Sequence, residues 1–343
     1  MQGSPLDRLE VRLETLRRRA ALLCAAVLLA ALPARAAWEP TKAVEIVVPA
    51  GAGGASDQMA RIIQSIVVKH QLMKQPLIPQ LKGGSSGAEG MMDVKESPGD
   101  PHKFLIAQSV IYTIPLATKL PFNWRDLTPI AMIAQDEFVL WVNAETPYKT
   151  AKDYVDAVRA APDKFKMGGT GSKREDHIIT AAMEKGLGLK FTYIPYKSGG
   201  ECSTQLVGKH IDSNVNNPSE SVAQWRAGQV RALCVFDTEK MPYPAKVTDT
   251  QAWSDIPTCR SAGVPVDYLM LRSIFLPGKV TADQAAYYVD LFKKVTSTPE
   301  WKQYLEQNAL KPVMLTGADF TKYLEGDEKR HQELMAAAGF IAK

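Results

Sequence analysis

Short β-branched runs alternate with amphipathic helical stretches along almost all of this 343-residue chain. In residues 44–67, VEIVVPAGAGGASDQMARIIQSIV, an apolar strand leads through a glycine-rich turn into a helix whose apolar residues recur every three or four positions. A similar unit, FKMGGTGSKREDH, begins at residue 165. This alternation predicts an α/β protein with mostly parallel sheets flanked by helices, rather than a β-sandwich or a helical bundle.

The length of the chain favours two lobes over a single core. We expect residues 38–142 and 238–343 to form the first lobe and residues 143–237 the second, because the regular pattern breaks down after residue 237 and returns near the C-terminus. Two crossings between the lobes would make a hinge. Ligands bind in clefts between such lobes, where the carboxyl ends of parallel strands meet.

The first 36 residues have the composition of a cleavable secretory signal. Arg17–Arg19 precede the apolar run Ala20–Leu32, and Ala34–Ala36 matches the A-x-A motif that signal peptidase recognises. The run has about a dozen residues and a membrane span needs roughly 20, so an N-terminal anchor is the less favoured alternative. We therefore expect export to the periplasm, with the Sec and Tat routes both open.

The charge of the chain argues against a nucleic-acid partner. The full chain has 41 Lys and Arg against 37 Asp and Glu. Cleavage after residue 36 leaves 35 against 34, so the mature protein is almost neutral. The sequence also lacks a basic stripe with interleaved aromatic residues, the pattern typical of nucleic-acid binding.

Three cysteines remain after cleavage, namely Cys202, Cys234 and Cys259. They form no C-x-x-C motif and have no histidine pair nearby, so we expect neither a metal site nor a cofactor. Three cysteines allow at most one intramolecular disulfide in an oxidising compartment. A Cys234–Cys259 bridge and three buried thiols are both open alternatives.

The glycine-rich turns are the predicted ligand site. Glycine lets backbone N–H groups approach a ligand closely, and the start of the following helix attracts anions. A tight turn that only permits helix–sheet packing is the alternative. The residues that we expect to contact a ligand are Ala50, Gly51, Gly53, Gly54, Ala55, Ser56, Asp57, Ser109, Gly169, Thr170, Gly171, Ser172, Tyr196, Lys197 and Asn217.

Charged and amide side chains beside these turns have two interpretations. Lys173 and Lys197 either supply positive charge to an anion or are simply solvated. Asn214, Asn216 and Asn217 end a predicted strand at the same rim. Their amides either bind polar atoms of a ligand or cap the next helix.

The second turn does not match the pattern of a hydrolase. Ser172 lies in GTGS, which lacks the G-x-S-x-G spacing of a nucleophile elbow, and His177 follows on the next helix. Asp176 is adjacent to His177 in sequence and is therefore badly placed to orient it. We expect no catalysis, and we expect Glu175 and Asp176 to lie on a solvated helix face.

Motifs spread over residues 40–340 resemble one known family. In order they are VVPAGAGGASDQMARII, GGSSGAEG, LPFNWRDLTPIAMIA, IPYKSGG, VGKHIDSNVNNPSESVAQWRAGQVRALCV, DIPTCRSAG and PEWKQYL. Each motif is loose by itself, but their order over this length is specific. The chain resembles the solute-binding proteins of tripartite tricarboxylate transporters, the TctC-like or Bug family.

This resemblance implies a two-lobed periplasmic binding protein, type II-like, that closes on its ligand as a venus flytrap. Family members bind carboxylates through the turn after the first strand and through facing turns of the other lobe. They deliver the ligand to a two-component membrane permease, and we expect a monomer without a cofactor. The positions with counterparts in the family are Gly53, Gly54, Ser56, Asp57, Gly171, Ser172, Tyr196 and Lys197.

Two departures from the family pattern leave the ligand open. The first turn reads AGAGGASD where the family usually has a Pro-Gly-Gly-Gly-Thr-Asp type of turn. Four residues separate Ser172 from His177 where two are common. Dicarboxylates, tricarboxylates and aromatic carboxylates therefore all remain as ligands. The alternative functions are a ligand-presenting subunit of a membrane sensor kinase and a secreted serine hydrolase that uses Ser172.

Overall fold

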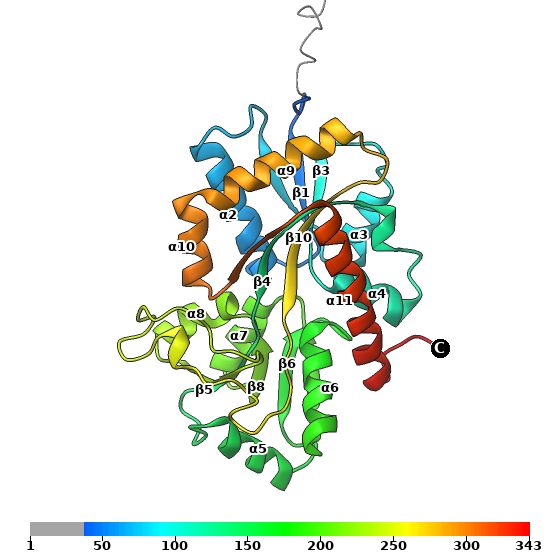
Figure 1. Cartoon of the computed structure of the whole chain (residues 1–343). Coiled ribbons are helices and arrows are strands. Elements are labelled where there is room, and N and C mark those ends of the chain that lie inside the picture. The colour runs from blue at the N-terminus through cyan, green and yellow to red at the C-terminus, as the bar shows by residue number, and fades with distance from the viewer. Residues whose placement is uncertain (1–37) are drawn as a thin grey trace, which may run out of the picture. The chain divides into compact units, whose positions relative to one another are not determined.

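The computed structural model describes residues 38–343, so the predicted signal segment, residues 1–36, lies outside the described residues. Residues Glu39–Lys343 form one compact unit that contains two sheets (Figure 1). Helices pack on the strands of both sheets. Among the described residues, we find no helix with the length and apolar character that crossing a membrane requires.

The elements fall into two lobes, one around each sheet. The strands of the first lobe are β1 (Val44–Val48), β2 (Leu77–Leu81), β3 (Lys103–Ala107), β4 (Thr128–Asp136), β10 (Met270–Leu276) and β11 (Lys311–Leu315). Its helices are α2 (Ala55–Lys69), α3 (Ala88–Lys95), α4 (Val110–Thr118), α9 (Ala282–Ser297), α10 (Pro299–Gln307) and α11 (Gly317–Ala337). The strands of the second lobe are β5 (Val139–Asn143), β6 (Lys166–Thr170), β7 (Thr192–Tyr196), β8 (Ser213–Asn216) and β9 (Val230–Val235). Its helices are α5 (Ala151–Ala160), α6 (Glu175–Leu187), α7 (Gly199–Val207) and α8 (Pro218–Arg226).

The expected two-lobed α/β architecture is confirmed, but its sheets are mixed rather than mostly parallel. The strand orders are β11-β4-β10-β3-β1-β2 and β7-β6-β8-β5-β9. In the first sheet, β1, β2 and β3 are parallel, and β10 runs antiparallel to its neighbours β3 and β4. In the second sheet, β6, β7 and β8 are parallel, and β5 runs antiparallel to its neighbours β8 and β9. The reason is that β5 and β10 begin where the chain has just crossed between the lobes. They run away from the crossing, while the parallel strands run toward it.

The first crossing lies earlier than we expected. β5 pairs with β8 and β9 of the second lobe, although the sequence analysis had placed residues up to 142 in the first lobe. The chain therefore crosses between Asp136, the last residue of β4, and Val139, the first residue of β5. Both strands are continuous apolar runs, which sequence alone does not assign to one sheet or the other.

The second crossing lies about 30 residues later than we expected, close to residue 269 rather than at 238. Residues 236–268 stay with the second lobe, because Cys259 is joined to Cys234 of β9 by a disulfide. Trp253 is also buried there, with its ring centroid 4.7 Å from that of Trp225. The Pro-rich composition after residue 237 marks the loss of regular structure, not the end of the lobe. The Cys234–Cys259 bridge is confirmed, and Cys202 is a buried free thiol.

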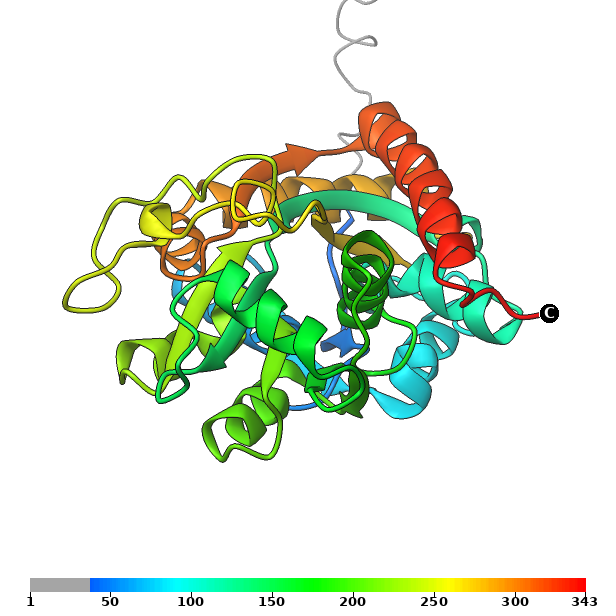
Figure 2. The same cartoon turned by 90° about the horizontal axis from the view of Figure 1, so that it is seen from below.

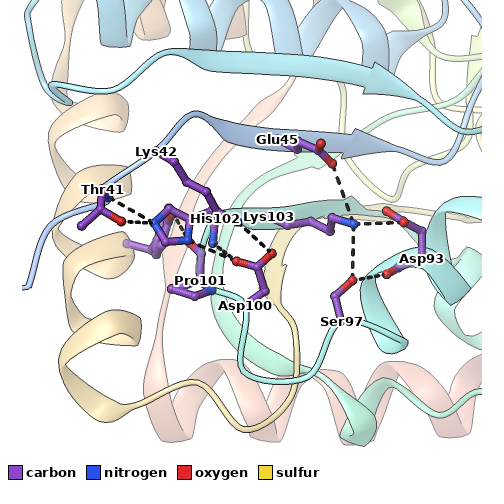
Figure 3. A network of polar contacts seen from close by, with 10 residues as sticks. Thr41, Lys42, Glu45, Asp93, Ser97, Asp100, Pro101, His102 and Lys103 are labelled. Carbon is purple, nitrogen blue, oxygen red and sulfur yellow. Dashed lines mark hydrogen bonds and ion pairs between the residues drawn. The ribbon is translucent and has the colours of Figure 1, made fainter.

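A network of polar contacts lies at the end of the first sheet where β1 and β3 begin (Figure 3). His102 Nε2 lies 3.2 Å from Thr41 Oγ1, and its Nδ1 lies 3.2 Å from Asp100 Oδ1. Lys103 Nζ donates to Asp93 Oδ1 at 3.0 Å. These contacts tie the segment before β1 to the loop before β3, at the strand ends opposite to those that lead into the glycine-rich turns.

The two lobes share a hydrophobic cluster. Ala117 of α4 and Met335 of α11 belong to the first lobe, yet they join the buried cluster that contains Ile178 and Met183 of α6. The long helix α11 lies at one side of the molecule in both views (Figures 1 and 2). Its packing against α6 holds the lobes together on that side.

Candidate functional site

Helices from both lobes begin at one enclosed cavity. Helix α2 comes from the first lobe, and α6, α7 and α8 come from the second. The N-cap residues of these helices all line the cavity, and they are Gly54, Arg174, Ser198 and Asn217. Each helix start presents backbone N–H groups that have no acceptor within the helix, and it carries roughly half a positive charge. The four starts therefore create positive potential between the lobes before any side chain is counted.

The site consists of two neighbouring cavities that share Thr170 and Arg174. The inner cavity has a volume of ≈ 20 Å³, enough for one group of the size of a water molecule. It is lined by Ala50, Gly54, Ala55, Ser56, Gln108, Phe138, Thr170, Arg174, Glu175, Asp176, Ser198, Asn217, Glu220, Met270 and Arg272. The outer cavity has a volume of ≈ 540 Å³. It is lined by Gly51, Gly83, Gly84, Ser85, Ser86, Thr170, Gly171, Ser172, Arg174, Pro195, Tyr196, Lys197 and Glu201.

Most of the residues singled out by the sequence lie at one of these cavities. The inner cavity contains Ala50, Gly54, Ala55, Ser56, Thr170 and Asn217. The outer cavity contains Gly51, Thr170, Gly171, Ser172, Tyr196 and Lys197. The remaining predicted residues, which line neither cavity, are Gly53, Asp57, Ser109 and Gly169. Asp57 instead accepts the backbone N–H of Gly53 at 2.9 Å and pairs with Arg61, so it stabilises the turn itself.

The charged residues that line the inner cavity were not among the ligand-site residues predicted from the sequence. Glu175 and Asp176 are only 3% and 4% exposed, so the prediction of a solvated helix face was wrong. They start α6 at the point where the two lobes meet, and the opposite lobe covers them. Arg272 could have been identified from the sequence, because it is the single charged residue in the apolar strand LMLRSIFLP. A charged side chain that is buried is usually paired, so this residue indicates a buried polar partner.

Arg272 and Asp136 form a fully buried ion pair between adjacent strands. Arg272 Nε donates to Asp136 Oδ2 at 2.7 Å, and its Nη2 also donates to that oxygen. Nη1 donates to Ser56 Oγ at 2.7 Å, and Nη2 donates to Asn217 Oδ1 at 3.3 Å. One guanidinium of the first lobe thus joins β4, the start of α2 and the N-cap of α8 in the second lobe.

Further hydrogen bonds cross between the lobes beside the cavities. Arg174 Nη1 donates to the carbonyl oxygen of Ser86 at 3.2 Å, and its Nε lies 3.3 Å from Glu175 Oε2. Gln58 Nε2 donates to the carbonyl oxygen of Ser219 at 3.3 Å. These bonds link the two lobes beside the cavities.

Carboxylates of the protein accept hydrogen bonds from two backbone N–H groups that we had expected to bind a ligand anion. Glu220 of α8 reaches across the lobes, and its Oε1 accepts the N–H of Ala55 at 3.0 Å. Asp176 Oδ2 accepts the N–H of Thr170 in the second turn. Burial raises the pKa of Glu220, and it raises the pKa of Asp176 well above its ordinary value, with the negative charge of Glu220 adding to the effect.

Replacing Asp176 by asparagine is expected to stabilise the solute-free protein at neutral pH. The pKa of Asp176 is higher in the folded chain than in the unfolded chain, where it is near 3.9. The carboxyl therefore favours folding only while it is protonated, and the protein loses that contribution as the pH rises through the folded pKa. We expect D176N to gain about 1 kcal/mol or more at pH 7 in urea unfolding.

The pH dependence provides the check on this prediction. The difference between D176N and the parent protein should shrink as the pH falls and should vanish below about pH 3, where the carboxyl is protonated in both the folded and the unfolded chain. D290N, at an exposed ion pair with Lys294, is the matched control and should show no comparable gain. A D176N protein that is less stable than its parent at pH 7 would contradict the prediction.

Replacing Gly199 by alanine is expected to break the contact between Glu220 and Ala55. A Cβ on Gly199 would lie 1.9 Å from Glu220 Oε2, so the Glu220 side chain would have to move. The buried N–H of Ala55 would then lose its acceptor, which costs about 1–2 kcal/mol. Urea unfolding measures this loss. G186A, where the nearest atom to the new Cβ is 3.9 Å away, is the control and should be neutral or slightly stabilising.

The side chains around Ser172 do not form a catalytic triad. His177 Nδ1 accepts the backbone N–H of Lys173 at 3.1 Å, and its ring stacks on Tyr193 with centroids 3.8 Å apart. Burial and the charge of Lys173 lower the pKa of His177 to about 4. His177 is therefore held as a neutral packing residue, and Asp176 is occupied by Thr170.

The chain is similar to known proteins over most of its length. The family model described as "Tripartite tricarboxylate transporter family receptor" (TctC) matches residues 59–340. The UPF0065 protein in the gbd 5' region of Cupriavidus necator is 24% identical over 320 residues, which cover 92% of this chain and 94% of the relative.

Solved structures with the same fold include periplasmic binding proteins. The structure of the periplasmic binding protein BugD aligns with a TM-score of 0.80 at 20% identity, covering 89% of this chain and 100% of BugD. An R. palustris protein solved with adipate aligns with a TM-score of 0.78 at 23% identity, covering 88% of this chain and 99% of that protein. These likenesses confirm the fold of a two-lobed periplasmic binding protein.

Proposed function

The chain belongs to the tripartite tricarboxylate transporter receptor family, and we propose that it captures a small organic carboxylate between its lobes for delivery to a two-component membrane permease. The observation that carries the proposal is the convergence of helix starts from both lobes on one closed site. The buried guanidinium groups of Arg174 and Arg272 line the same inner cavity. Helix starts and guanidinium groups are the groups that proteins use to bind carboxylates.

The outer cavity suits the carboxylate end of the solute. It is bordered by the glycine turns at Gly51 and Gly171 and by the side chains of Arg174 and Lys197. Arg174 belongs to the second lobe and already bonds to Ser86 of the first. An anion beside Arg174 would therefore be contacted from both lobes, so that binding favours the closed state.

Isothermal titration calorimetry against a panel of carboxylates tests the proposal. The panel holds dicarboxylates, tricarboxylates and aromatic carboxylates, and it includes adipate because a protein of the same fold was solved with it. We expect saturable binding at one site, with affinity at least tenfold lower in R174A, which corresponds to about 1.4 kcal/mol. R159A removes an exposed arginine of α5 and should leave the affinity unchanged. If no carboxylate binds, the proposal fails.

Delivery to a permease is tested in cells of the source organism. Deleting the gene should abolish uptake of the carboxylate identified by calorimetry, and a plasmid copy should restore the uptake. A copy with R174A should restore less at limiting concentrations of the solute. Normal uptake combined with loss of a transcriptional response would instead identify the partner as a sensor kinase.

A further inference from the structure

The inner cavity holds more negative than positive side-chain charge. Arg272 is paired with Asp136, and Arg174 lies beside Glu175. Two carboxyl groups remain at the cavity, those of Asp176 and Glu220. Among the described residues, no cationic side chain forms an ion pair with either of them, and each accepts a hydrogen bond from a backbone N–H instead.

The inner cavity also has an acceptor without a donor. Glu175 is 3% exposed and lines the cavity, and its Oε1 has no hydrogen-bond partner within residues 38–343. A buried carboxylate oxygen without a donor costs free energy, so its environment should include a donor when the site is filled. Asp176, Glu220 and Glu175 thus offer carboxyl oxygens as acceptors at one small cavity.

The helix starts only partly compensate for these carboxylates. Burial raises the pKa of Glu220. The hydrogen bond from the N–H of Ala55 and the positive charge of Arg272 lower this pKa only in part. Burial raises the pKa of Asp176 well above its ordinary value, and the negative charges of Glu220 and Glu175 raise it further. These carboxyl groups repel one another at the inner cavity, and a cation between them would remove that repulsion.

The cation that fits this space is organic rather than metallic. Within the described residues, no group of three or more His, Cys, Asp or Glu side chains is placed to hold a metal ion. The volume of ≈ 20 Å³ accommodates one group of the size of a water molecule. An ammonium group has that size, and its N–H groups donate to carboxyl oxygens without needing the close set of ligands that a metal ion requires.

We propose that the solute carries a protonated amino group that enters the inner cavity beside the carboxyl groups of Asp176, Glu220 and Glu175, while its carboxylate lies in the outer cavity. The proposal rests on the function proposed above and narrows the ligand to an amino carboxylate whose two charged groups are separated. Arg174, which borders both cavities, would mark the boundary between the two ends. Glu220 comes from the lobe opposite to α2, so the ammonium group would also bind most tightly in the closed state.

Matched pairs of solutes test this inference by calorimetry at pH 7. Each pair combines a straight-chain dicarboxylate with the ω-amino carboxylate that has the same number of methylene groups, for spacers of two to five methylenes. Alkylamines of the same lengths complete the panel. We expect the amino carboxylate of the best pair to bind at least tenfold more tightly than its dicarboxylate.

Variants of the carboxyl groups make the assignment specific. D176N and E220Q should each weaken binding of the amino carboxylate at least tenfold and reduce the preference over the dicarboxylate. The exposed control D290N should change neither value. Thermal unfolding of each variant without solute shows that the protein is folded, and D176N is expected to be at least as stable as its parent.

The outcomes separate this inference from the proposed function. A dicarboxylate that binds more tightly than its amino counterpart would overturn the inference and leave the carboxylate carrier intact. An alkylamine that binds as tightly as the amino carboxylate would support the ammonium site but contradict the carboxylate part of the proposed function. If no member of the panel binds, the inference falls together with the proposed function.

Discussion

Replacing Arg272 by methionine is expected to lower the free energy of unfolding by about 3–5 kcal/mol. The guanidinium is 1% exposed and supplies both charge-assisted bonds to Asp136, which is completely buried. Methionine keeps most of the volume but leaves the Asp136 carboxylate without a counter-charge. It also removes the donors to Ser56 and Asn217, so the start of α2 and the contact between the lobes lose a common partner.

Urea unfolding followed by tryptophan fluorescence measures this effect. The double variant R272M/D136L should recover a large part of the loss, because replacing both members of a buried pair by apolar residues is far less costly than removing one of them. R260M, at an exposed pair with Asp267, is the control and should cost at most about 1 kcal/mol. A loss of less than 1 kcal/mol in R272M would contradict the assigned role of the pair.

Removing the Cys234–Cys259 disulfide is expected to cost about 3 kcal/mol. The bridge closes a loop with a sequence separation of 25 residues, and much of that loop has no regular secondary structure. Without the bridge the unfolded chain gains conformational freedom, and the segment that carries Trp253 loses its covalent tie to β9. The first lobe has no comparable link, so the loss should appear in the unfolding of the second lobe.

The measurement compares C234A/C259A with the parent protein in urea, each with and without reductant. The double variant should be insensitive to reductant, whereas the parent should fall to about the same stability when it is reduced. C202A is the control, because Cys202 is a free buried thiol and its removal should leave the response to reductant unchanged. Equal stability of the parent in both conditions would contradict the prediction.

Local structure follows closely from the sequence. The run VEIVV forms β1, and Thr150, the residue before α5, accepts the N–H of Asp153 at 3.2 Å. The glycine turns after β1 and β6 lie at the two cavities. These features depend on residues within a few positions of one another, so short-range propensities and hydrogen bonds determine them.

The sign of the charge at the site did not follow from the sequence. Glu220 lies 165 positions from Ala55 in the chain, and nothing near Glu220 indicates that it would cap a helix of the other lobe. Glu175 and Asp176 look like an ordinary acidic helix start until a second lobe covers them. Their pairing and burial depend on long-range packing, which a local pattern does not contain.

The sequence by itself determined the strand, turn and helix units, the glycine turns at the site and the family to which the chain belongs. Only the tertiary structure decided where the chain crosses between the lobes, which strands run antiparallel and which carboxylates are buried at the inner cavity. The physical reason is the distance along the chain over which each kind of interaction acts. Backbone propensities act between neighbours in sequence, whereas the desolvation of Asp176 and Glu220 arises when two lobes that are distant in sequence close on each other.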